Sequence, residues 1–178
     1  MRDRRRRVWG VAVAVGLAAA VFAAIPRAEA KDPPRSVEPK GLVAVRAAMK
    51  LLATTQVGPV PGTPKEQALP MLADWSSIVT DWMTPLERSP YTLGAGVRGM
   101  VRLFVGEEGT DDLSIHLFVD DVDRERLRKF VMTVGRELGY VMHDSDDDRW
   151  SCFGVAQGRR DLWIGVGVGL VSIEASIP

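Results

Sequence analysis

The sequence predicts an α+β fold in which N-terminal helices precede a strand-strand-helix-strand-strand unit. Three observations support this prediction. Apolar residues recur at helical spacing over residues 41–92, they alternate along two pairs of segments within residues 93–178, and one strongly amphipathic segment separates the pairs. Because each element must bury its apolar face, we expect a two-layer sandwich with a mostly antiparallel, four-stranded sheet packed on a helix over residues 122–138. Residues 41–92 and 93–178 are expected to form one domain.

Residues 1–30 have the three parts of an export signal peptide. A run of arginines opens the chain, residues 8–25 carry no charge, and Ala28 and Ala30 supply the small side chains that a signal peptidase reads. We expect cleavage after Ala30, by the Sec or the twin-arginine route, and a folded part that is periplasmic, secreted or held in a bacterial cell envelope. The alternative is an uncleaved membrane anchor, because the apolar run reaches the lower end of the roughly 17–25 residues that span a bilayer.

The rest of the chain is mildly acidic. Residues 1–30 hold six of the 23 basic residues and two of the 23 acidic ones, which leaves 17 basic and 21 acidic residues from Lys31 onward, a net charge of −4. Domains that bind nucleic acids are typically basic, so no nucleic-acid partner is expected. Cys152 is the single cysteine, which excludes an internal disulfide, and its alternating surroundings predict a buried strand residue.

Residues 31–40 are charged and rich in proline, which predicts a disordered tether. An amphipathic helix is expected directly after it, because apolar side chains recur there at helical spacing, at Leu42, Val45, Met49 and Leu52. Prolines and glycines then interrupt the pattern over residues 57–64.

Two further helical segments are expected before residue 92. The first begins with a capping box of Thr63 and Glu66 around Pro64 and ends or kinks at Pro70. The second covers residues 71–83 and places four apolar side chains on one face, at Leu72, Trp75, Val79 and Trp82.

Four segments of the second half alternate as strands do. These segments are residues 97–105, 113–119, 149–156 and 161–176. The intervening helix has aspartates at its start, where the helix dipole favours negative charge, and Gly139 can end it.

One face of the last predicted strand is nearly free of side chains, with Gly165, Gly167 and Gly169 following Trp163. Such a strip lets another element approach closely. The same face of the first hairpin should carry Arg98, Met100, Arg102, Phe104, His116 and Phe118. We expect the segment bearing Trp75 and Trp82 to pack there as a helix. The alternative is an open aromatic and arginine surface that binds a partner.

The stretch LGAGVRGMV fits the pattern of a glycine-rich phosphate loop, G-x-G-x-x-G-x-V. A dinucleotide loop must follow a strand and open a helix, whereas this one opens a strand, and no kinase motif follows it. We therefore interpret it as a turn into a strand and expect no nucleotide or other cofactor.

No catalytic or metal-binding constellation emerges from the remaining residues. Asp144, Asp146 and Asp148 alternate like the first ligands of a calcium loop, but Arg149 stands where that loop needs glycine. With Asp147, these aspartates would at most attract a cation weakly. Two histidines cannot form a three-histidine site, and no nucleophile elbow is present.

The expected function is therefore an exported, non-catalytic binding module of the cell envelope or the secreted fraction. Its partner would be another such protein, and its binding residues would be Arg98, Arg102, Phe104, His116 and Phe118. A second hypothesis is a carrier that holds an apolar ligand between the sheet and the tryptophan-bearing helices. A third is a hydrolase that uses His116.

Overall fold

The structure is a computed structural model that describes residues 38–94, 96–145 and 150–177. The export signal, the alternative anchor, most of the tether, and Asp146 to Asp148 lie outside the described residues. Glu38–Pro178 is a compact unit with its own hydrophobic core.

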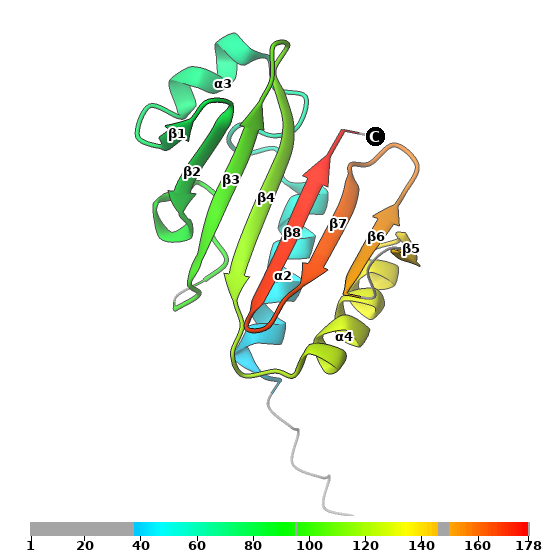
Figure 1. The fold of residues 1–178 in the computed structure, drawn as a ribbon. Coiled ribbons are helices and arrows are strands. Elements are labelled where there is room, and N and C mark those ends of the chain that lie inside the picture. The colour runs from blue at the N-terminus through cyan, green and yellow to red at the C-terminus, as the bar shows by residue number, and fades with distance from the viewer. Residues whose placement is uncertain (1–37, 95, 146–149, 178) are drawn as a thin grey trace, which may run out of the picture. The chain divides into compact units, whose positions relative to one another are not determined.

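This unit is α+β, as predicted, but its sheet has eight strands rather than four (Figure 1). All neighbouring strands are antiparallel, in the order β1-β2-β3-β4-β8-β7-β6-β5. The strands are β1 (Ser76–Ile78), β2 (Asp81–Pro85), β3 (Gly99–Val105), β4 (Thr110–Phe118), β5 (Val141–Asp144), β6 (Ser151–Val155), β7 (Asp161–Val166) and β8 (Leu170–Ser176).

Two long helices, α2 (Lys40–Thr54) and α4 (Arg124–Glu137), lie side by side on one face of the sheet (Figure 1). The predicted alternation of β3 and β4 is confirmed, because the side chains that face the helices are buried. The central core residues include Val45, Met49, Leu52, Val101, Leu103, Leu113, Ile115, Leu127, Val131 and Ile173. The intervening helix is also confirmed: the Asp123 side chain caps α4 by accepting a hydrogen bond from the Arg126 amide, and Gly139 follows its end at a φ of 86°.

The predicted helix over residues 71–83 is wrong. Helix α3 (Lys65–Met71) ends one residue after Pro70, as that proline requires, and a β-hairpin follows it. The hairpin turn places Val79 at a φ of 58°, a left-handed conformation that β-branched residues rarely adopt. The turn contains no glycine or asparagine that would have predicted a hairpin, so the helical spacing of the apolar residues led to the prediction of a helix.

The predicted capping box is wrong as well. Pro64 is the N-cap of α3, with no side-chain cap. The Thr63 amide instead donates a hydrogen bond to Thr110 Oγ1, at the start of β4, over 2.9 Å. Pro64 forms an isolated antiparallel β-bridge with Gly109, in the turn before β4. Tertiary contacts therefore hold the start of α3.

The last predicted strand is two strands. Val166 pairs with Val171, and Gly169 has a φ of 67° in the turn between β7 and β8. Gly167 and Gly169 fit the alternating pattern of one long strand in the sequence, but in the structure they lie in the turn that reverses the chain. Strand β5, which completes the eight, lies at the start of the predicted acidic loop.

Candidate functional site

The face of the sheet opposite α2 and α4, here called the open face, carries the side chains that alternate with the core. No helix of the described residues packs on it (Figure 1). The strand pairing aligns one row of side chains across this face, which runs through Met83, Arg102, Ser114, Glu174, Trp163, Phe153 and His143.

Three stacked rings form one half of this row. His143 and Phe153 have centroids 5.0 Å apart and ring planes at 21°, and Phe153 and Trp163 have centroids 5.0 Å apart and planes at 24°. This spacing is close to the separation of neighbouring strands, so each ring stands against the next one. Trp163 is 46% exposed despite its size. We call these three residues the aromatic row.

Charged side chains gather around the other half of the row, where Arg102 and Glu174 lie on the same face as Asp81 and Asp112. Arg102 Nε donates to Asp81 Oδ1 over 2.8 Å, and this hydrogen bond raises the arginine pKa. Burial raises the pKa of both Asp112 and Glu174. The neighbouring Asp111 adds to the shift at Asp112, Asp112 adds to the shift at Glu174, and Arg102 opposes both. Negative charge is therefore crowded here.

The predicted binding residues lie at one side of this surface. Arg102, Phe104, His116 and Phe118 point to the open face from β3 and β4, whereas Arg98 is exposed just before β3. Their role in binding stays a prediction. The aromatic row and Glu174 were not predicted as binding residues. The alternation of residues 149–156 and 161–166 was the signal that could have found Phe153 and Trp163.

The predicted packing of a tryptophan helix on the glycine strip is wrong. Trp82 lies on β2 opposite Leu103 and therefore faces the helix side, while Gly165 lies on β7, with β3, β4 and β8 between them. Trp75 packs edge-to-face on Tyr91, with ring centroids 6.5 Å apart.

His116, the residue of the hydrolase hypothesis, lies on the open face of β4 beside Ser114. Its Nε2 lies 3.2 Å from Ser114 Oγ, but the Ser114 side chain is buried between its neighbours, with 2% of the residue exposed. Burial, and then the charge of Arg102, lower the pKa of His116, so the imidazole is neutral at pH 7. Ser114 and His116 both lie on β4 and on the same face of that strand, and the buried Ser114 hydroxyl is not accessible.

The glycines of LGAGVRGMV have structural roles. Gly94 and Gly96 have φ values of 108° and 81° in the turn before β3. A Cβ at Gly99 would lie 2.3 Å from the backbone oxygen of His116, so only glycine fits there. The positive φ values of Gly94 and Gly96 and the close contact at Gly99 give each of the three glycines a structural reason.

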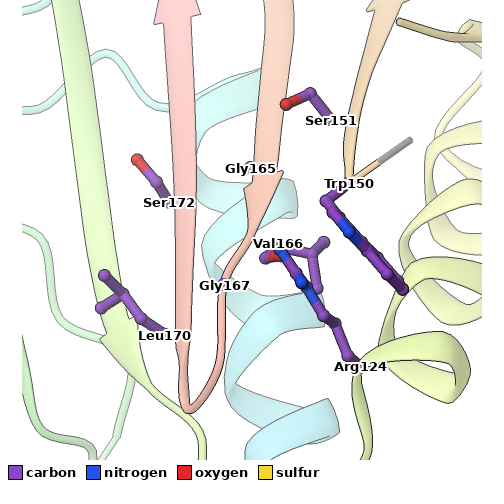
Figure 2. Close-up of a pocket in the computed structure, with 8 residues that line it drawn as sticks. All are labelled: Arg124, Trp150, Ser151, Gly165, Val166, Gly167, Leu170 and Ser172. Atoms are coloured by element: carbon purple, nitrogen blue, oxygen red, sulfur yellow. The ribbon is translucent and has the colours of Figure 1, made fainter. Parts of the chain in front are cut away.

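A hollow of about 230 Å³ opens where β7 turns into β8 (Figure 2). Its lining residues are Arg124, Trp150, Ser151, Gly165, Val166, Gly167, Leu170 and Ser172. The Arg124 guanidinium lies over the Trp150 ring, 3.8 Å from its centroid, and its Nε donates to the carbonyl of Val166 over 2.7 Å. We call this hollow the Arg124 pocket.

Compared with known proteins, the chain has no significant match. Neither family models, nor curated sequences, nor solved structures resemble it at a significant level.

No three His, Cys, Asp or Glu side chains of residues 38–94, 96–145 and 150–177 come together to hold a metal ion. Asp144 forms an ion pair with Arg128 at 2.6 Å. Cys152 is buried, as its alternation predicts, and burial raises its pKa to about 11. No described helix is long and apolar enough to span a membrane.

Proposed function

We propose that this protein is an exported, non-catalytic binding module whose open face binds a basic segment of another envelope or secreted protein. The observation that carries the proposal is the aromatic row, which stands beside crowded carboxylates on a sheet face that no described helix covers. Tryptophan, phenylalanine and arginine are enriched in protein interfaces, and tryptophan and arginine are enriched among the few residues that carry most of the binding energy.

Exposed aromatic area supports an interface. Phe118 is 55% exposed and Trp163 is 46% exposed, and both lie on the open face. Large apolar side chains gathered on one face cost free energy in water unless a partner covers them. Phe118 lies on β4 opposite Leu170 of β8, and Trp163 lies on β7 opposite Glu174 of β8, so a single segment that covers both must run diagonally across β8.

Charge complementarity indicates a basic partner. Asp81, Asp112, Asp161 and Glu174 point to the open face, and Arg102 is paired with Asp81. The other three carboxylates form no ion pair with a described residue. A lysine or arginine placed between Glu174 and Trp163 would gain both a carboxylate and a ring face.

The carrier hypothesis placed an apolar ligand between the sheet and helices that carry Trp75 and Trp82. Neither tryptophan lies in a helix, so this site is not formed. The space between α2, α4 and the sheet is filled by core side chains such as Met49, Leu52 and Leu127. An apolar ligand therefore remains only as an outcome of the experiment.

The test is retention of native proteins on the immobilised chain from residue 31 onward. Solubilised envelope and secreted fractions are passed over the wild type, over an open-face variant with Phe118→Ser and Trp163→Ser, and over a control with Val43→Ser and Val57→Ser. The control removes exposed apolar side chains of similar number outside the open face. Crosslinking with mass spectrometry then maps the contact of each retained protein.

The expected result is a protein retained by the wild type and the control, lost by the open-face variant, and crosslinked to the open face through a basic segment. Retention unchanged in the open-face variant would overturn the proposal. So would a contact that maps to α2 and α4, or specific retention of lipid with no protein.

A further inference from the structure

The Arg124 pocket exists because two positions on the open face lack side chains. Gly165 and Gly167 follow Trp163 along β7 and its turn, and a Cβ at Gly165 would meet only Ser172 Cβ, at 3.9 Å. A larger residue could therefore occupy position 165 without a backbone clash. Strand packing therefore does not require glycine at position 165, and the missing side chain leaves room for a ligand.

A fixed cation forms one wall of the pocket. In Figure 2 the Arg124 side chain extends from the start of α4 toward β7 and lies alongside the ring of Trp150. The bond from Nε to the Val166 carbonyl and the stacked ring hold the guanidinium plane, which leaves its terminal nitrogens to donate. Within the described chain Arg124 forms no ion pair.

The other walls suit a small molecule with an apolar body. Leu170, which is 37% exposed, contributes aliphatic surface, and Ser151 and Ser172 line the pocket from the neighbouring strands (Figure 2). The volume of about 230 Å³ is below the roughly 300–1,000 Å³ of pockets that hold drug-sized ligands. A nucleotide is too large for this space, whereas a short organic acid fits it.

We propose that the Arg124 pocket binds a carboxylate that carries a short aliphatic chain. The carboxylate would accept two hydrogen bonds from the terminal nitrogens of Arg124, and the chain would lie over Gly165 against Leu170. A planar guanidinium held in one orientation binds a carboxylate in this bidentate way. The same group could come from a free short-chain acid or from the last residue of a peptide. This inference is independent of the protein partner proposed above, because it needs neither the aromatic row nor Glu174.

The experiment is a titration of the chain from residue 31 onward, followed by heteronuclear NMR, with sodium butyrate as the probe. Butyrate should shift the Gly165 and Gly167 amides and the Arg124 Nε–H resonance in a saturable way. Arg124→Gln and Gly165→Val should each weaken binding by about tenfold or more, the first by removing the donors and the second by filling the space. Arg126→Gln, an exposed arginine on the same turn of α4, should leave binding unchanged.

Two peptides distinguish the sources of the carboxylate. An acetylated dipeptide that ends in a free valine is compared with its amide. Tighter binding of the free-acid peptide than of butyrate would assign the pocket to a peptide C-terminus, and binding of butyrate alone would assign it to small acids. The proposal is overturned if butyrate gives no saturable shift at millimolar concentration, or if Arg124→Gln binds as the wild type does while its spectrum shows an intact fold. The Phe118→Ser, Trp163→Ser variant should bind butyrate normally, so a failed partner interaction would leave this result unaffected.

Discussion

Trp163 on β7 and Glu174 on β8 are direct cross-strand partners on the open face. The aromatic row ends at this pair and the crowded carboxylates begin there. A face of the Trp163 ring therefore borders negative charge, which is the arrangement that attracts a cation.

The two sides of the sheet should respond differently to truncation. Trp163→Ala should lower the free energy of unfolding by about 1 kcal/mol, because an exposed cross-strand ring contributes little to stability. Ile173→Ala, on the buried side of β8, should lower it by about 2–5 kcal/mol through the cavity that it leaves. Urea denaturation measures both. A larger loss for Trp163→Ala than for Ile173→Ala would show that the aromatic row is a structural element and not a binding surface.

Asp112→Asn should lower the pKa of Glu174, since the Asp112 charge is one cause of its raised value. A raised carboxylate pKa means that the folded protein holds the proton more tightly than the unfolded chain does. Such a group stabilises the fold fully below its unfolded pKa, and this contribution is lost as the pH rises through the raised folded value. Carboxyl NMR titration of Glu174 gives the shift. An unchanged Glu174 pKa in Asp112→Asn would leave burial as its cause.

Val79→Gly should stabilise the protein. Val79 has a φ of 58° and is 92% exposed, so the substitution relieves a left-handed backbone without removing buried surface. We expect a gain of about 1 kcal/mol in the free energy of unfolding. Val57→Gly, at another exposed valine, is the control and should give no gain. A loss of stability in Val79→Gly would mean that the β1–β2 turn has a different backbone.

Gly99→Ala should destabilise the fold by about 1–3 kcal/mol, because the new methyl group would lie 2.3 Å from the His116 carbonyl oxygen and the β3–β4 pairing would have to shift. Gly165→Ala is the matched control, with open space at the same kind of strand position. Thermal unfolding compares the two variants. Equal melting temperatures would remove the steric explanation of the glycine pattern before β3.

Local signals in the sequence predicted a large part of this fold. The period of two in β3 and β4 placed Val101 and Leu103 on one face and Arg102 on the other, because successive strand side chains alternate between faces. Asp123 and Gly139 marked the two ends of α4 through interactions within a few residues. These features need no knowledge of distant contacts.

The errors have physical causes that local patterns do not contain. Residues 76–85 form a hairpin because β2 pairs with β3, which overrides their helical spacing, and the turn uses Val79 in a strained conformation. The aromatic row was missed because its register depends on the pairing of β5, β6 and β7, and the Arg124 pocket unites residues from α4, β7 and β8.

The central position of β8 determines the order in which this fold can be completed. β8 follows every other described element along the chain, yet it lies between β4 and β7 and joins the two halves of the sheet. Until β8 has been synthesised, the edges of β4 and β7 that face it have no partner strand, and the two halves of the sheet cannot join. The sheet is therefore complete only once β8 is in place, and a chain that lacks β8 would expose two strand edges on which other chains can aggregate.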